Sequence, residues 1–92
     1  MQNVLKYLDD HRRQREDALR QLLRIPSVSA NPAHRDDCAR AADWVARRLL
    51  DLDFAVEVIP TSGHPLVYAE SPAVADAPTA LVYGHYDVQP PE

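Results

Sequence analysis

The feature that most constrains the fold of this sequence is a short apolar run near its end, Ala80-Leu81-Val82-Tyr83, followed by a glycine and a short polar segment. A continuous apolar run is typical of a strand that is buried on both faces, as in the centre of an α/β sheet. Such a strand needs neighbouring strands and a covering layer on each face. The rest of the sequence offers few elements to surround it. We therefore expect residues 1–92 to be the front part of a larger α/β domain, with an incomplete sheet.

Two helices are predicted before the strands, because apolar residues recur at helical spacing in two segments. The first segment runs from Val4 to Leu23 and ends before Pro26, since the residue before a proline avoids the helical region. The second begins with Asn31 as N-cap and Pro32 as the first helical residue. This second helix should be the better packed, with an apolar stripe made of Cys38, Ala42, Val45, Ala46, Leu49 and Leu52.

Three strands are predicted after the helices. Residues 54–59 alternate in the manner of a strand, residues 61–65 have turn chemistry, and residues 66–70 form a second short strand. These two strands are expected to pair as a hairpin. With residues 80–83 as the third strand, the predicted order is helix, helix, strand, strand, strand.

Composition excludes several classes of function. The formal net charge is −4 with both signs interspersed, which favours neither a nucleic acid nor a membrane as partner. Arginines between residues 12 and 24 are interpreted as a solvated helix face. The single cysteine, Cys38, excludes an internal disulfide and a cysteine cluster for zinc, and we interpret it as a small core residue. Without an apolar signal segment or a membrane span, a cytoplasmic protein is expected.

The candidate site is His85 with Asp87, directly after the apolar run. Open α/β sheets place their ligands at the carboxyl ends of strands. Residues two apart in an extended chain point to the same face, so one nitrogen of His85 could bind a metal while Asp87 accepts a hydrogen bond from the other. The alternative, a histidine that only satisfies its hydrogen bonds at a strand end, stays open, because His-x-Asp spacing alone is not specific.

The other histidines are interpreted without a ligand role. His34 and Asp36 repeat the His-x-Asp spacing, but they lie in a polar loop at a helix start, where complementation of the helix dipole is the simpler explanation. We interpret His64, between Gly63 and Pro65, as a turn residue and His11 as helix surface.

Two segments together resemble a known family. The segment Leu81-Val-Tyr-Gly-His-Tyr-Asp-Val-Gln-Pro90 resembles the first metal-binding motif of the zinc peptidases that include cytosolic non-specific dipeptidase, carnosinase, aminoacylase, acetylornithine deacetylase and glutamate carboxypeptidase. Leu23-Arg-Ile-Pro-Ser-Val-Ser29 resembles the segment that closes the first helix in these enzymes. The order of elements also agrees. Gln89 resembles the dipeptidase branch, since the deacetylase branches more often carry a second valine there.

The resemblance implies that residues 1–92 are the N-terminal part of a three-layer α/β/α catalytic domain. His85 would bind one of two zinc ions, and Asp87 would act in catalysis by holding the His85 ring. The complete protein would hydrolyse a dipeptide or short peptide through a water activated by two metals, whereas this segment alone, with one ligand, is expected to be inactive. The remaining ligands, the general base and any dimerisation domain would lie elsewhere in the complete protein.

Two alternatives remain open. The first is an amidohydrolase of the same family that acts on an N-acyl amino acid. The second is a non-catalytic module. The resemblance implies that a later strand separates the second and third strands, and an unpaired strand edge invites a homodimer or strand-swapped self-association.

Overall fold

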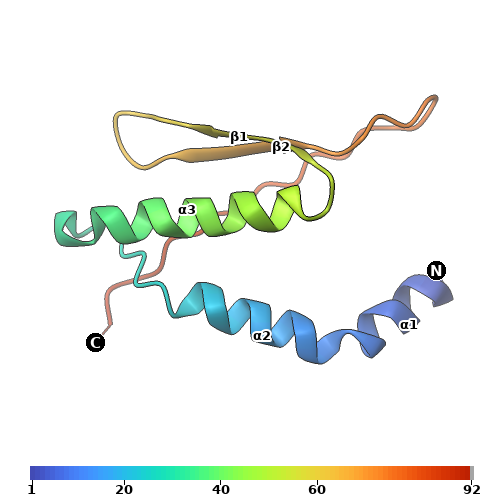
Figure 1. The fold of residues 1–92 in the computed structure, drawn as a ribbon, viewed down its shortest axis with the longest axis horizontal. Coiled ribbons are helices and arrows are strands. Elements are labelled where there is room, and N and C mark those ends of the chain that lie inside the picture. The colour runs from blue at the N-terminus through green and yellow to red at the C-terminus, as the bar shows by residue number, and fades with distance from the viewer. Residues whose placement is uncertain (92) are drawn as a thin grey trace.

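The computed structural model describes residues 1–91 as helices on one side of a small β-hairpin (Figure 1). Helix α3 lies between the hairpin and α2, and the C-terminal segment runs past α3 toward the end of α2. The elements are α1 (Gln2–Asp10), α2 (Arg12–Leu23), the 3-10 helix η1 (Pro32–His34), α3 (Arg35–Leu50), β1 (Ala55–Ile59) and β2 (Leu66–Glu70).

The first predicted helix is divided at His11, which corrects the expectation of one continuous helix. His11 has φ −110° and ψ 15°, outside the helical range. Its ring Nδ1 donates to the carbonyl oxygen of Tyr7 at 2.8 Å, and the same oxygen accepts the His11 backbone N–H at 3.0 Å. A side chain inserted into the helical ladder is a known cause of a kink. Helix α1 buries none of its residues.

Helix α3 carries the core, as predicted for the better-packed helix. The Asn31 side chain accepts a hydrogen bond from the Ala33 N–H at 3.0 Å, which confirms its capping role, although the first turn is 3-10 and α3 itself begins at Arg35. The predicted stripe is buried at its centre and half-buried or exposed toward its end. The fully or nearly buried residues of α3 are Cys38, Ala41, Ala42 and Ala46. These small side chains let neighbouring backbone approach α3 closely.

The end of α3 requires a left-handed residue. Asp53 has φ 64°, a conformation that glycine adopts without the penalty that a Cβ brings. The Phe54 N–H returns to the Leu49 carbonyl at 3.1 Å, which reverses the chain into β1. Asp53 therefore occupies a position whose backbone conformation favours glycine.

The predicted hairpin is present, and its second strand, β2, has the predicted bounds. β1 and β2 are antiparallel, with Val56 opposite Ala69 and Val58 opposite Val67. One face rests on α3, so that Val56, Val67 and Ala69 are half-buried. The edge of β2 that does not contact β1 has no strand beside it within residues 1–91.

The prediction of a third strand at residues 80–83 is wrong. Residues 80–83 belong to no helix or sheet, and Leu81, Val82 and Tyr83 are 91%, 90% and 89% exposed. A strand gains its stability from hydrogen bonds and side-chain contacts to a neighbour. This segment has no such neighbour in the part of the chain that the structure describes. The fold class is α/β with an incomplete sheet, as expected, but the sheet has two strands.

The molecule is more open than a compact domain of its mass. Its accessible surface is 7987 Å², whereas a folded monomer of 10.3 kDa exposes about 5,400 Å². Its radius of gyration is 15.4 Å, against about 12 Å for a compact chain of this length. About 2,600 Å² of surface is therefore exposed that a compact fold would cover.

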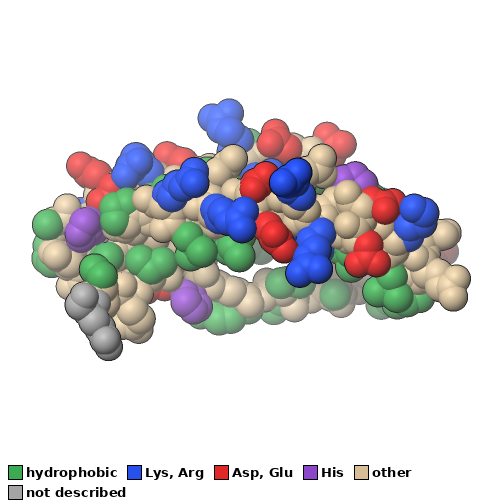
Figure 2. Space-filling model, turned by 90° about the horizontal axis from the view of Figure 1, so that it is seen from below, with side chains coloured by type: hydrophobic (Ala, Val, Ile, Leu, Met, Phe, Trp, Pro, Cys, Tyr) green, Lys and Arg blue, Asp and Glu red, His purple; other side chains and the backbone are tan. Residues whose placement is uncertain are grey.

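Charged side chains of both signs alternate over the face that α2 presents to solvent (Figure 2). Arg12 lies 2.9 Å from Glu16, and Arg20 lies 3.2 Å from Asp17. This pairing confirms that the arginines of α2 form a solvated helix face. Within residues 1–91, no helix is long and apolar enough to cross a membrane.

Candidate functional site

The segment around His85 is held by the loop between α2 and η1. The Val88 N–H donates to the Ser27 carbonyl at 3.0 Å, and Val28 and Val88 form an isolated parallel bridge. Ser27 is fully buried, and its hydroxyl donates to the Tyr86 carbonyl at 2.9 Å. A buried hydroxyl with a hydrogen-bond partner 59 residues away is a strong positional restraint. The loop therefore fixes the backbone on both sides of Asp87.

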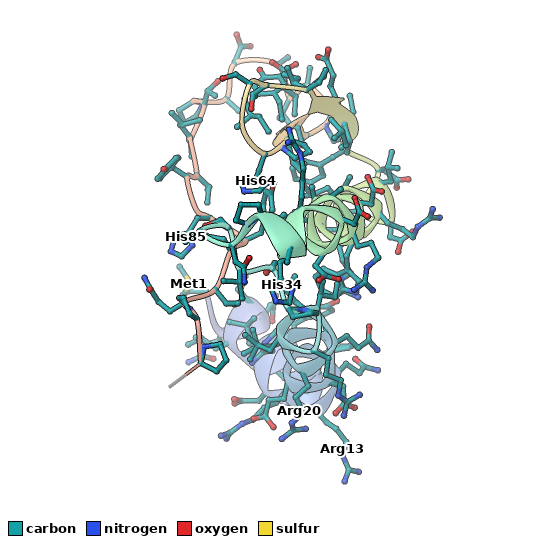
Figure 3. All side chains as sticks on the ribbon, turned by 90° about the vertical axis from the view of Figure 1, so that its left-hand side faces the viewer. Met1, Arg13, Arg20, His34, His64 and His85 are labelled. Carbon is teal, nitrogen blue, oxygen red and sulfur yellow. The ribbon has the colours of Figure 1, made fainter. Side chains whose placement is uncertain are left out.

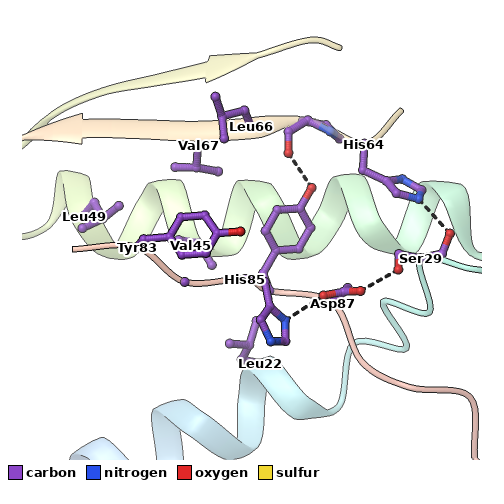
Figure 4. Close-up of a pocket in the computed structure, with 13 residues that line it drawn as sticks. Leu22, Ser29, Val45, Leu49, His64, Leu66, Val67, Tyr83, His85 and Asp87 are labelled. Atoms are coloured by element: carbon purple, nitrogen blue, oxygen red, sulfur yellow. Dashed lines mark hydrogen bonds and ion pairs between the residues drawn. The ribbon is translucent and has the colours of Figure 1, made fainter. Parts of the chain in front are cut away.

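The predicted hydrogen bond between His85 and Asp87 is present (Figure 4). The Nδ1 atom of His85 lies 2.7 Å from Oδ1 of Asp87. An ionised carboxylate only accepts, so Nδ1 carries the proton and the neutral ring keeps its lone pair on Nε2. The His85 side chain is 78% exposed and that of Asp87 is 39% exposed. The geometry thus leaves one imidazole nitrogen of His85 open to a metal or another ligand.

Asp87 is held in its ionised form. The Ser29 hydroxyl donates to Oδ2 of Asp87 at 2.6 Å. This hydrogen bond, followed by that from His85, keeps the pKa of Asp87 below its usual value, although partial burial opposes the effect. Both carboxylate oxygens therefore have a partner. Ser29 is a site residue that sequence reasoning missed, since no local pattern pairs residues 58 apart.

His64 is a second residue that the sequence did not reveal. Its Nε2 donates to the Ser29 carbonyl at 3.0 Å, and its Nδ1 is buried without a partner among the residues described. The next residue, Pro65, accepts a hydrogen bond from the Tyr86 hydroxyl at 2.6 Å. His64 does lie in a turn, as predicted, but that turn contacts both the loop and the site. Viewed along the axis of α3, the side chains of His64 and His85 lie on the same side of the helix (Figure 3).

A pocket of about 520 Å³ opens beside this network. Its apolar wall comes from α2, α3 and β2, and its polar end is formed by His64, Ser29, Asp87 and His85 (Figure 4). The apolar lining consists of Leu22, Val45, Leu49, Pro65, Leu66 and Val67, with Tyr83 and Tyr86 at its border. This pocket is a groove that lies between β2 and Tyr83, the last residue of the expected third strand.

Two other histidines differ in part from their sequence interpretation, because His34 pairs with Asp37 and not with Asp36, and half-buried His11 divides the first helix. Nδ1 of His34 lies 2.7 Å from Oδ2 of Asp37, and the other carboxylate oxygen of Asp37 contacts Arg40, so His34 belongs to a hydrogen-bonded cluster in the first turn of α3. His11 lies at the junction of α1 and α2. Cys38 is fully buried, and burial raises the pKa of its thiol, which makes it a core residue and not a nucleophile.

A complete metal site is not formed by the described residues. Among residues 1–91, no three His, Cys, Asp or Glu side chains lie close enough together to hold a metal ion. The chemistry of His85 fits one ligand, because a neutral imidazole whose other nitrogen donates to a carboxylate is the common form of a zinc-binding histidine. A zinc site needs three or four ligands. The others would have to come from outside these residues.

Comparison with known proteins gives one informative similarity. The chain is 38% identical over 74 residues to a cysteinylglycine-S-conjugate dipeptidase of Corynebacterium striatum. The match covers 78% of this chain and 16% of that protein. The chain is thus similar to part of a dipeptidase-type peptidase. No family model matches the chain, and no solved structure matches it.

The similarity supports the coarser part of the sequence interpretation. The match to a dipeptidase agrees with the expected peptidase class, and the chain spans about a sixth of the curated relative's length.

Proposed function

We propose that this chain is the N-terminal part of a zinc-dependent dipeptidase, in which His85 binds one metal ion and Asp87 holds the His85 ring. The observation that carries the proposal is the orientation of His85, whose Nδ1 donates to Asp87 while Nε2 stays open. The similarity to a cysteinylglycine-S-conjugate dipeptidase supports the reaction class. Dipeptides, including S-conjugates of Cys-Gly, are therefore the first substrates to test.

The residues of this chain would contribute orientation and charge. Asp87 fixes the tautomer of His85 and raises the basicity of Nε2, which strengthens its bond to a metal. The ionised state of Asp87, favoured by Ser29, preserves this arrangement at neutral pH. A bound zinc pair would supply the Lewis acidity that peptide hydrolysis requires. Because no three His, Cys, Asp or Glu side chains among residues 1–91 lie close enough together to hold a metal ion, we expect the 92-residue chain by itself to show no hydrolysis.

The proposal is tested on the full-length gene product, with dipeptides and N-acyl amino acids as competing substrates. Hydrolysis of dipeptides that a chelator abolishes and zinc restores is expected. His85→Ala should lower this activity at least about 100-fold, since it removes a metal ligand, whereas His11→Ala, at the distant junction of α1 and α2, should leave it unchanged. Hydrolysis of N-acyl amino acids alone would favour the deacylase alternative. No metal-dependent hydrolysis of either class would refute the proposal.

A second candidate function, self-association, is favoured by the exposed surface. The excess of about 2,600 Å² is well above the roughly 800 Å² that each partner buries in a standard interface. The chain presents both an unpaired edge of β2 and an unpaired apolar run at residues 80–83. We propose that residues 80–84 of a second copy would lie along β2 in the groove beside it. The free edge of β2 lacks a strand to pair with, and the apolar run lacks a neighbouring strand, so each could pair with the other.

Sedimentation of the 92-residue chain over a range of concentrations tests this candidate. A dimer is expected, and Val82→Asp should dissociate it without unfolding the monomer, because Val82 is 90% exposed. Val74→Asp is the control, because Val74 is also exposed, at 71%, and is not among the residues that line the groove. A monomer at every concentration, or a dimer unaffected by Val82→Asp, would rule out this mode of association.

A further inference from the structure

Beyond His85 and Asp87, a set of contacts converges on the second oxygen of the Asp87 carboxylate. Ser29 donates to Oδ2 at 2.6 Å while His85 donates to Oδ1 at 2.7 Å. A carboxylate with one partner can rotate and exchange its oxygens. With a partner on each oxygen, its plane is fixed, and so is the direction in which it receives the His85 N–H.

The position of Ser29 is itself fixed from the hairpin side. Its backbone carbonyl accepts a hydrogen bond from Nε2 of His64 at 3.0 Å. A carbonyl only accepts, so Nε2 of His64 carries the proton, and the neutral ring has an unprotonated Nδ1. That Nδ1 is buried with no partner in the described chain, which costs free energy. A leucine would avoid this cost, so packing alone does not explain a histidine here.

The turn that carries His64 also contacts the site segment directly. The hydroxyl of Tyr86 donates to the carbonyl of Pro65 at 2.6 Å. Residues 64 and 65 therefore contact Ser29 on one side and Tyr86, the neighbour of His85, on the other. The three segments form a closed set of hydrogen bonds that is visible in Figure 4.

We propose that Ser29 and His64 are positioning residues for the His85 ring. Ser29 occupies one oxygen of Asp87 and so leaves the other for Nδ1 of His85. His64 holds the Ser29 backbone at the distance that this contact requires. The inference rests on the proposed function, because it gives these residues a purpose only if His85 binds a metal through Nε2.

The tautomer of His85 is the direct readout, since a merely structural role would not change it. Imidazole nitrogen-15 spectra of the 92-residue chain at about pH 8.5, above the usual imidazole pKa, report which nitrogen holds the proton. His85 in the natural sequence should be protonated at Nδ1. In Ser29→Ala, a substantial fraction should move to the Nε2-protonated form, whereas Ser29→Thr, which retains the hydroxyl, should restore the natural spectrum. Ser62→Ala, at an exposed serine of the hairpin turn, is the control.

His64 provides a second test if Ser29→Ala does not fold. His64→Gln keeps an N–H donor near the position of Nε2 and should preserve the His85 tautomer. His64→Leu removes the donor and should shift it in the same direction as Ser29→Ala. An unchanged His85 tautomer in Ser29→Ala, or in His64→Leu, with the amide spectrum still that of the folded chain, would overturn the proposal.

Activity of the full-length gene product separates this proposal from the proposed function. Loss of a group that orients a metal-binding histidine lowers activity about 10- to 100-fold, and this loss is expected for Ser29→Ala with dipeptide substrates. An enzyme that hydrolyses dipeptides but is unaffected by Ser29→Ala would refute the positioning role alone. A gene product without hydrolysis, in which Ser29→Ala still shifts the His85 tautomer, would refute the proposed function and retain the positioning role.

Discussion

Truncation of Leu81 tests whether the apolar run at residues 80–83 contributes to the folded chain. The Leu81 side chain is 91% exposed, so folding removes only a small part of it from water. Full burial of a leucine is worth about 1.5–3 kcal/mol, and the covered fraction is therefore worth about 0.3 kcal/mol at most. We expect Leu81→Ala to change the free energy of unfolding of the monomer by no more than this amount.

Val28 offers the matched control. It is 4% exposed and lies in the loop that pairs with Val88, so Val28→Ala removes buried methyl groups and leaves a cavity. The expected loss is about 2 kcal/mol. For a chain of this length, that loss lowers the melting temperature by about 10 °C, whereas Leu81→Ala should lower it by less than about 2 °C.

Urea unfolding is the assay, followed by the fluorescence of the single tryptophan, Trp44, at a concentration at which sedimentation shows a monomer. The monomer is required because a second copy covering residues 80–84 would raise the cost of Leu81→Ala. A loss greater than about 1 kcal/mol in the monomer would exceed what the exposed side chain can contribute. That result would show that Leu81 is packed against the rest of the monomer, and it would refute the exposed, unpaired conformation.

Three further predictions each concern a single residue. Ser27→Ala should destabilise the chain by about 1–3 kcal/mol, because the Tyr86 carbonyl loses its buried donor; a loss no larger than that at an exposed serine would contradict it. The contact with Arg40 lowers the pKa of Asp37. Ionised Asp37 therefore stabilises the fold fully above the usual aspartate pKa of about 4, and this stabilisation is lost as the pH falls through the lowered pKa. Asp37→Asn should therefore be less stable at neutral pH and equal to the natural sequence in strong acid, and urea midpoints that differ equally at every pH would contradict this. Asp53→Gly should stabilise the chain by about 0.5–1 kcal/mol, since φ is 64° there, and a lower urea midpoint would contradict it.

Local features of the fold could be predicted from the sequence because their causes are local. The N-cap at Asn31 depends on a side chain and a backbone N–H two residues apart. The bounds of β2, Leu66–Glu70, follow from turn chemistry on one side and a loop rich in proline and alanine on the other. The buried face of α3 follows from helical spacing. In each case, the residues that decide the outcome are neighbours along the chain.

The third strand could not be predicted correctly, because strand formation is not a local property. The composition of residues 80–83 favours a buried strand, but hydrogen bonds from a neighbour decide whether one forms. The groove beside β2 has an apolar lining and leaves these residues without such a neighbour. The sequence therefore predicts a buried strand at residues 80–83, whereas the structure shows that residues 1–91 leave these residues exposed and without a neighbouring strand.

The site shows the same division between local and distant causes. His85 and Asp87 are two residues apart, and spacing was enough to predict their hydrogen bond. Ser29 and His64 come from two other segments, and their contacts with the site follow from the closeness of the loop and the hairpin turn to α3. The resemblance at Leu23–Ser29 concerned the end of the first helix and assigned no role to Ser29. The reason is physical: a histidine that presents Nε2 to a ligand needs a fixed acceptor at Nδ1, and an acceptor so close in sequence is fixed only when a more distant part of the chain holds it.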